Sequence, residues 1–340
     1  MKKTLCLVAA VMGLFACKNQ EVSEQTPVVE EPQVTTQQNN GAAYFANPIA
    51  WNGTFIEIGS AMTKTASSAQ HAPMRTNEDP SYPLYFIDPQ DGTWPVTVTV
   101  SYGEEGVMGV DGLEHSGIMR ISATNLFEQP GSVVTPAFEN FQVYGTLLTG
   151  TQKIENLGKN LNDHLVYDVT VSNGVFGSGS EFVYSEHTRR ELVSGLGAND
   201  LLLPDVTTHQ YSITGWMKGV SSIDTIPGYE ITIDESAPMV IAVGDLYPTA
   251  GHVVITFDKP IVYNFSEEEM TKGIPVASIS VDECEMSFLG RVSDGVYRAK
   301  VLVPVNNVSF STITVSIQFN MDARGIVMES VTFGVEGLEG

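Results

Sequence analysis

The strongest constraint on the fold of this 340-residue chain is an alternation of apolar and polar side chains between residues 94 and 158. Val96, Val98 and Val100 would lie on one face of an extended chain, with threonine and serine residues between them on the other. A period of two residues is typical of a β-strand with one buried and one solvated face. Asp111-Gly112 is a residue pair that favours a tight turn. The stretch therefore predicts antiparallel strands joined by hairpins.

The same alternation extends to both sides of this stretch and predicts one antiparallel β-domain over residues 84–236. Its further strands are expected at 165–175, 181–187, 211–217 and 229–233. About nine strands, over roughly 150 residues, are enough to bury a stable core without the rest of the chain. Periodicity does not distinguish an open barrel from a sandwich. Gly145 is predicted to occupy a hairpin turn with a positive φ.

A second β pattern begins after a turn-rich, acidic boundary at 234–238. Residues 253–261 read VVITFDKPI and resemble the second strand of bacterial Ig-like modules, which often carry a Phe-x-x-Pro-Val/Ile element, here from Phe257 to Ile261. Short strands are expected at 276–281, 296–303, 309–319 and 327–334. This spacing predicts a smaller Ig-like β-sandwich over 237–336, and hence an all-β chain of two antiparallel domains.

The N-terminus has the features of a secretion signal over residues 1–16. A basic start precedes an apolar run from Thr4 to Phe15, which is too short to cross a hydrocarbon layer of ~30 Å as a helix. The run ends Leu14-Phe15-Ala16-Cys17, which resembles a bacterial lipobox and predicts an acylated Cys17. An ordinary signal peptide with a chance cysteine is the alternative.

The next two segments carry no regular pattern. Residues 17–43 hold the cysteine and a Gln-, Glu-, Thr- and Pro-rich stretch that predicts a disordered tether, with a reach of about 25–30 Å. Residues 44–83 are expected to be an irregular lead-in, with a short strand at 52–58 and loop from Ser60 to Asp79. No long helix is predicted anywhere in the chain.

An ordered series of short motifs runs through the first β-domain. It comprises Trp94-Pro95-Val96-Thr97, Tyr102-Gly103, Asp111-Gly112, Gly117, Gly131-Ser132-Val133, Glu139-Asn140-Phe141, Val143, Gly145, Gly150-Thr151, Asn156, Gly158, 187–192 and 211–215. In these motifs residues 84–236 resemble a family of uncharacterised outer-membrane lipoproteins of Bacteroidota. The resemblance implies a lipid-anchored protein at the outer membrane, on the cell surface or the periplasmic face, and implies no activity. Family members often carry a cysteine after the aromatic-Gly turn, where this chain has Val107 and Met108, so no thiol role follows.

Charge and cysteine content restrict the partners. Removal of the signal takes away two of 17 cationic residues, which leaves 15 against 40 acidic residues and a net charge of −25. Such a surface repels phosphate backbones, so no nucleic-acid partner is predicted. Cys6 leaves with the signal and Cys17 is acylated, so Cys284 has no intramolecular partner and is expected to be an inert buried thiol.

A search for reactive groups predicts no catalytic residue, no cofactor site and no metal site. The six histidines (71, 115, 164, 187, 209 and 252) show no zinc-ligand spacing, and no nucleophile elbow or phosphate loop is present. His187, Arg189 and Arg190 form the densest polar group, expected at a solvated strand edge or in an ion pair. Asn160–Asp163 and Asp282–Glu285 offer oxygens to calcium but lack the spacing of a known loop.

The function predicted from these observations is a non-catalytic binding or structural role in the cell envelope, with the membrane as partner through acyl chains on Cys17. One alternative is an accessory lipoprotein that captures carbohydrate or peptide for nutrient uptake, in which Trp51, Trp94 or Trp216 stacks on a sugar instead of packing in the core. Another is a hydrolase whose two carboxylates meet only in the fold, ~5–10 Å apart in a cleft. A surface adhesin, for which repeated Ig-like modules would be expected, is a third.

Overall fold

The structure is a computed structural model, and it divides into two units, each described by itself below. One comprises residues 46–255, and the other comprises residues 256–340 with 1–45. The division therefore falls later in the chain than the boundary expected at 236/237. The described residues are 41–68, 83–177, 182–195, 206–245, 247–264, 278–293, 296–304, 312–322 and 325–336. The predicted signal, Cys17 and the tether up to residue 40 lie outside them.

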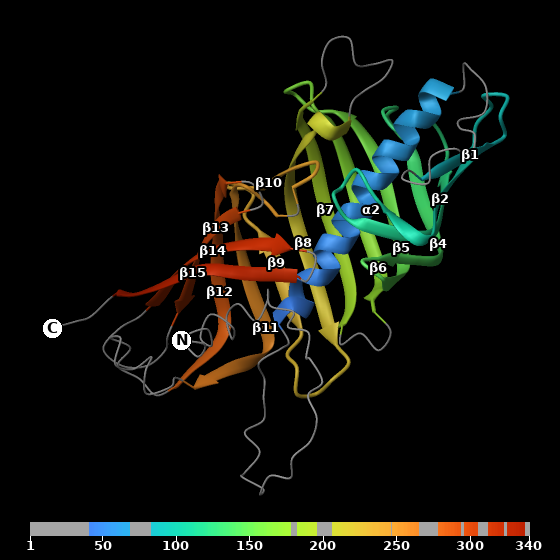
Figure 1. The fold of residues 1–340 in the computed structure, drawn as a ribbon. Helices are drawn as coiled ribbons and strands as arrows, with labels where there is room; N and C mark the ends of the chain where they lie inside the picture. Colours follow the sequence, from blue (N-terminus) through green and yellow to red (C-terminus); the bar gives the residue numbers. More distant parts are fainter. Residues whose placement is uncertain are drawn as a thin grey trace, which may run out of the picture. The chain divides into compact units, whose positions relative to one another are not determined.

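The unit 46–255 is built on a curved antiparallel sheet (Figure 1). The strands β1 to β9 pair in the order of the sequence, β10 pairs with β8 alongside β9, and β1 has one neighbour among the described strands. The sheet is therefore open and not closed on itself. Its strands are β1 (Leu84–Asp88), β2 (Val96–Met108), β3 (Glu114–Ala123), β4 (Val133–Val143), β5 (Thr146–Lys159), β6 (Leu165–Phe176), β7 (Phe182–Ser194), β8 (Gln210–Ser221), β9 (Tyr229–Ile233) and β10 (Met239–Ala242), with a 3₁₀ turn η1 at Val206–Thr208.

Burial along the strands follows the predicted alternation. Val96, Val98 and Val100 are buried, while the residues between them are half-exposed. In β7 the pattern is equally regular, with every second residue from Phe182 to Arg190 buried. The all-β, antiparallel class predicted from the two-residue period is confirmed.

One long helix, α2 (Gly41–Ser68), lies against the concave side of this sheet (Figure 1). The expected irregular lead-in is therefore wrong for residues 44–68, the strand at 52–58 is absent, and the helix takes the last residues of the expected tether. Almost every side chain between Asn47 and Thr63 is buried. A helix that is buried on all sides has no polar face, so the 3.6-residue periodicity that would reveal it is missing. Pro48 and the interior glycines Gly53 and Gly59 lower its intrinsic propensity further, so tertiary packing stabilises it.

Aromatic side chains join α2 to the sheet. Trp51 packs edge-on against Phe138, with 5.7 Å between ring centroids. Phe55 packs against Tyr167 at 5.9 Å and against Tyr211 at 5.2 Å. Because Trp51 and Phe55 are fully buried, the core of this unit includes α2 as well as the strands.

The second unit also consists of antiparallel strands. β11 (Gly251–Asn264) crosses the division between the units, and β12 (Ser278–Ser293), β13 (Val296–Pro304), β14 (Thr312–Asp322) and β15 (Gly325–Glu336) follow. β12 to β15 pair consecutively, as in a meander. An Ig-like sandwich needs Greek-key connections between two sheets, so the order of the described strands lends no support to that resemblance.

Cys284 lies in β12 and is fully buried, as expected. Burial, followed by the charges of Glu283 and Glu285, raises the pKa of its thiol to about 12. The thiolate that reacts with electrophiles is therefore scarce at neutral pH.

In the described part of the chain, no helix is both long enough and apolar enough to span a membrane.

The Gly145 turn allows a direct test of the sheet. Val143 pairs with Thr146, and Tyr144 and Gly145 between them have φ values of 48° and 68°. A Cβ at 145 would meet no atom within 4 Å, so a substitution there costs only backbone strain. Gly145→Val should lower the free energy of unfolding by ~1–3 kcal/mol, measured by chemical denaturation. Gly145→Asn should lower it less, because Asn tolerates positive φ, and equal losses would show that the turn is not strained.

Candidate functional site

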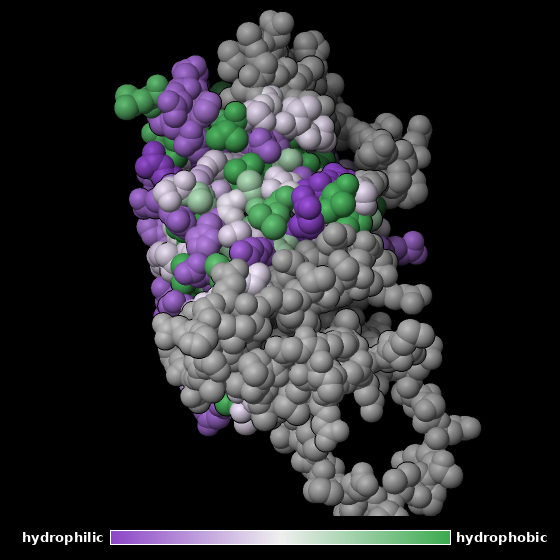
Figure 2. Space-filling view, turned by 90° about the vertical axis from the view of Figure 1, so that its left-hand side faces the viewer, coloured by the Kyte–Doolittle hydropathy of each residue, from purple (hydrophilic) through white to green (hydrophobic). Residues whose placement is uncertain are grey.

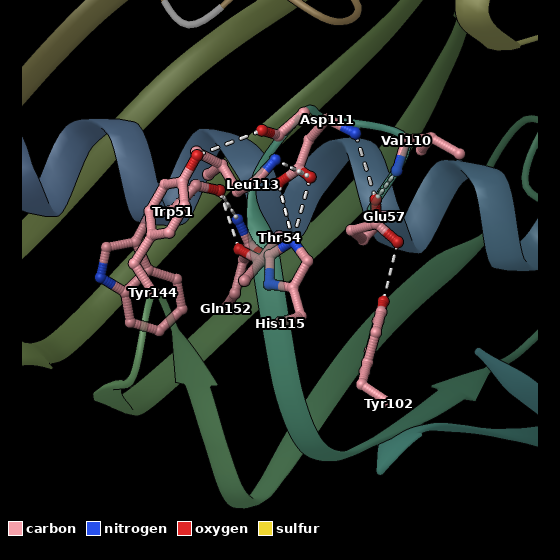
Figure 3. A network of polar contacts seen from close by, with 11 residues as sticks. Trp51, Thr54, Glu57, Tyr102, Val110, Asp111, Leu113, His115, Tyr144 and Gln152 are labelled. Atoms are coloured by element: carbon pink, nitrogen blue, oxygen red, sulfur yellow. Dashed lines mark hydrogen bonds and ion pairs between the residues drawn. The ribbon is translucent and has the colours of Figure 1, made fainter. Parts of the chain in front are cut away.

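Among the described residues, the most concentrated group of titratable side chains lies between α2 and the hairpin formed by β2 and β3 (Figure 3). Glu57 comes from α2, Asp111 from the turn after β2, and His115 from β3. We call these three residues the carboxylate–imidazole cluster. Their side chains are 1%, 1% and 0% exposed, respectively. The cluster is thus sealed from solvent.

Glu57 binds the turn between β2 and β3 through its carboxylate. The hydroxyl of Tyr102 donates to Oε2 at 2.8 Å. The backbone N–H groups of Val110 and Asp111 donate to Oε1 at 2.5 and 3.2 Å. One helix side chain thereby satisfies two backbone donors and fixes the turn against α2.

Asp111 holds the imidazole of His115. Nε2 of His115 lies 3.0 and 2.9 Å from the two carboxylate oxygens of Asp111, and the N–H of Leu113 donates to Oδ1 at 3.0 Å. The imidazole also stacks on Phe141, with 5.4 Å between ring centroids. The other ring nitrogen, Nδ1, is buried and has no hydrogen-bond partner.

Burial and mutual charge shift the proton affinities in this cluster. Burial, followed by the charge of Asp111, raises the pKa of Glu57 against the opposing effects of His115 and Tyr102. Burial lowers the pKa of His115, but its hydrogen bond to Asp111 and the charges of Asp111 and Glu57 more than offset this and leave it raised. Both shifts favour bound protons, which reduce the net negative charge of the cluster.

The cluster also has the composition of a cation site. One potential ligand atom from each of Glu57, Asp111 and His115 lies within 4.8 Å of the other two. The hydrolase alternative requires two carboxylates that meet only in the fold, and Glu57 and Asp111 meet in this way. Both are buried, so neither can touch a substrate in this conformation.

A second buried polar group, which we call the arginine cluster, centres on Arg190 of β7. Its guanidinium donates to Glu186 at 2.8 Å and to Asn52 of α2 at 2.7 Å. Glu186 also accepts from the hydroxyls of Tyr184 and Thr188. The Arg190 guanidinium lies 4.4 Å from the ring centroid of Phe55, in cation–π geometry. This buried ion pair is a second attachment point between α2 and the sheet.

The residues of the polar group expected around His187 lie on opposite faces of β7. Arg190 points inward, whereas His187 and Arg189 point to solvent. Arg190 forms the expected ion pair with Glu186 on the inner face, and on the outer face His187 lies 2.9 Å from Asp168 of β6. The expected strand edge is wrong, because β7 lies between β6 and β8.

The three tryptophans occupy three environments. Trp51 is buried and Trp94 is half-buried. Trp216 of β8 is 37% exposed on the solvated face, with its ring edge-on to His187 at 6.4 Å. Of the three, Trp216 is the most exposed and is best placed to stack on a sugar.

Neither expected calcium candidate has the surroundings of a calcium site. Asn160–Asp163 is a turn in which Asn160 Oδ1 accepts from two backbone N–H groups and Asp163 accepts from Lys159 at 2.9 Å. A shallow surface depression of about 630 Å³ beside it is lined by Lys159, Asn160, Leu161, Asn162 and Arg189, so two cations face it. Asp282–Glu285 lies within strand β12 and not in a loop.

Comparisons with protein-family models, with curated proteins and with solved structures each found no match to this chain. The resemblance to Bacteroidota lipoproteins therefore remains a prediction.

Sequence reasoning missed the carboxylate–imidazole cluster. Asp111 was interpreted only as a turn residue, and His115 only as one of six scattered histidines. The spacing Asp111-x-x-x-His115 was the available signal, because a tight turn can return the chain so that the two side chains meet. Glu57 had no such signal, since its helix was not predicted.

The arginine cluster leads to a stability prediction. Arg190→Met leaves the Glu186 carboxylate buried without a cation and should lower the free energy of unfolding by ~3–5 kcal/mol. Arg190→Met with Glu186→Gln removes that uncompensated charge, so the double variant should be more stable than Arg190→Met alone. Chemical denaturation of the single and double variants measures this coupling, and a double variant less stable than Arg190→Met would contradict it.

Proposed function

We propose that this protein is a lipid-anchored protein of the bacterial outer membrane with a non-catalytic binding or structural role. The observation that carries the proposal is the sequence Leu14-Phe15-Ala16-Cys17 at the end of a short apolar run. Cleavage before Cys17 would remove that run and leave acyl chains as the membrane anchor. The polar stretch that follows would hold the β-structure away from the lipid headgroups.

The arrangement of the first unit supports binding on its outer surface. The concave side of the sheet is occupied by α2, and the carboxylate–imidazole cluster beneath the helix is sealed. On the face drawn in Figure 2, hydrophobic and hydrophilic side chains of the described residues are interspersed. A ligand would therefore meet the solvated faces of the strands and the loops.

The anchor is tested by Cys17→Ala. This variant should lose labelling by a palmitate analogue and should leave an unprocessed or soluble product, because the acylated thiol is gone. Protease added to intact cells then distinguishes the two faces: release of the folded part indicates the cell surface, and protection indicates the periplasmic side. Undiminished labelling of Cys17→Ala would overturn the lipoprotein assignment.

Carbohydrate capture is the second candidate function, and Trp216 is the observation that favours it. In the strand register, Trp216 lies opposite His187 on one side and Thr232 on the other. His187 is hydrogen-bonded to Asp168. An exposed aromatic ring flanked by hydroxyl, imidazole and carboxylate groups offers both a stacking face and hydrogen-bond partners to a sugar.

A glycan array probed with the full chain tests this candidate. Trp216→Ala should weaken binding to any retained glycan about tenfold, the loss expected for one aromatic contact. Phe86→Ala is the matched control, because Phe86 is a 59% exposed aromatic residue on β1 of the same unit. Equal binding by the wild type and by Trp216→Ala would exclude this surface as the glycan site.

A further inference from the structure

We propose that Glu57, Asp111 and His115 bind one divalent transition-metal ion of the zinc and manganese class. The ion would fasten α2 to the turn between β2 and β3. This site goes beyond the proposed envelope function and does not depend on it.

The geometry of the three side chains is close to that of a metal centre. Their nearest potential ligand atoms lie within 4.8 Å of one another. Two ligands with bonds of ~2.0–2.2 Å to one tetrahedral ion lie ~3.3–3.6 Å apart. Nε2 of His115 is already 2.9 Å from Asp111 Oδ2, and the carboxylates would adjust around the ion to complete the site.

The charges favour a cation more strongly here than in the arginine cluster. There, one buried carboxylate, Glu186, is paired with a permanent cation, Arg190. Here, two buried carboxylates share one imidazole, and in the described part of the chain neither is hydrogen-bonded to a lysine or arginine. Buried carboxylates that are not matched by a permanent cation are costly even when they are hydrogen-bonded. A divalent ion supplies two positive charges and leaves the imidazole neutral, with a lone pair for coordination.

The side chain of His115 directs one ring nitrogen, Nε2, at the carboxylates. It is fully buried, and its Nδ1 has no hydrogen-bond partner. Its ring is thus held by hydrogen bonds at one nitrogen only. When the ion binds, the imidazolium releases its Nε2 proton to solvent and keeps the proton on Nδ1, so that the neutral ring coordinates the metal through the Nε2 lone pair.

Gly109 shows how closely the three groups converge. A Cβ at this position would lie 2.4 Å from Glu57 Oε1, 2.5 Å from Asp111 Oδ1 and 2.7 Å from His115 Cδ2. No side chain fits there. Glycine at residue 109 therefore lets the backbone of the turn come close to all three groups.

The ligand types select the class of metal. One imidazole with two carboxylates suits zinc or manganese, whereas calcium takes six to eight oxygens. Tyr102 serves as a positioning residue and not as a ligand: burial, followed by the charge of Glu57, raises the pKa of its phenol far above the usual value, so it remains a hydrogen-bond donor to Glu57. Because all three ligands are buried, the ion enters as α2 docks, and the site is structural.

The test uses the full, untagged chain in detergent, unfolded with a chelator and refolded with Zn²⁺, with Mn²⁺, with Ca²⁺ or without metal. After removal of free ions, elemental analysis should find about one Zn²⁺ or Mn²⁺ per chain and little Ca²⁺. The thermal midpoint should rise by several degrees relative to the metal-free protein. Refolded protein with neither retained ion nor a shifted midpoint would overturn the proposal.

Paired variants assign the ion to this cluster. Glu57→Gln removes one ligand charge and should lose the ion and the shift in midpoint. The double variant Glu186→Gln with Arg190→Met neutralises an equally buried carboxylate in the arginine cluster without leaving an unpaired charge, and it should retain both. Retention of one ion by Glu57→Gln would place the metal elsewhere and overturn the assignment.

If Glu57→Gln does not fold, refolding of the wild-type protein with Co²⁺ still tests whether the site binds a metal ion. Wild-type protein refolded with Co²⁺ should show the intense visible absorption of four- or five-coordinate cobalt with protein ligands. The weak spectrum of the hydrated ion alone would count against the site.

Discussion

The packing of α2 against the concave face of the sheet is the interaction on which the rest of the first unit depends. Phe55 contacts Tyr167 of β6 and Tyr211 of β8, and Trp51 contacts Phe138 of β4. An open sheet with large aromatic residues on one face must cover that face to be stable in water, and the helix provides the cover.

Polar contacts determine which face of the helix meets which strand. A helix buried on all sides has no solvated stripe to fix its rotation. Glu57 binds the turn after β2, and Asn52 binds Arg190 of β7, so the two contacts attach the helix to distant parts of the sheet. Buried polar groups are costly unless they are matched, which penalises other rotations of α2. The proposed metal ion would strengthen the first of these attachments.

The strands could be predicted from the sequence because their signal is local. Val96 to Val100 alternate, and Gly145 marks its turn, whatever the rest of the chain does. The helix could not be predicted, because residues 47–63 combine an apolar composition without periodicity, Pro48 and two glycines. Prediction of the carboxylate–imidazole cluster required this helix, because Glu57 lies on it. Without the helix, there was no reason in the sequence to place Glu57 beside Asp111 and His115. Arg190 and His187 belong to one sequence motif, yet alternation sends them to opposite faces, and only the register shows their partners.

The most direct test of this account compares two fragments, 41–255 with α2 and 84–255 without it. The first should unfold cooperatively on heating, because it keeps the helix that covers the sheet. The second should show no cooperative transition and should bind a hydrophobic dye, and addition of a peptide of residues 41–68 should restore the transition. A fragment 84–255 that unfolds cooperatively at the same midpoint as 41–255 would contradict the claim that the sheet depends on α2.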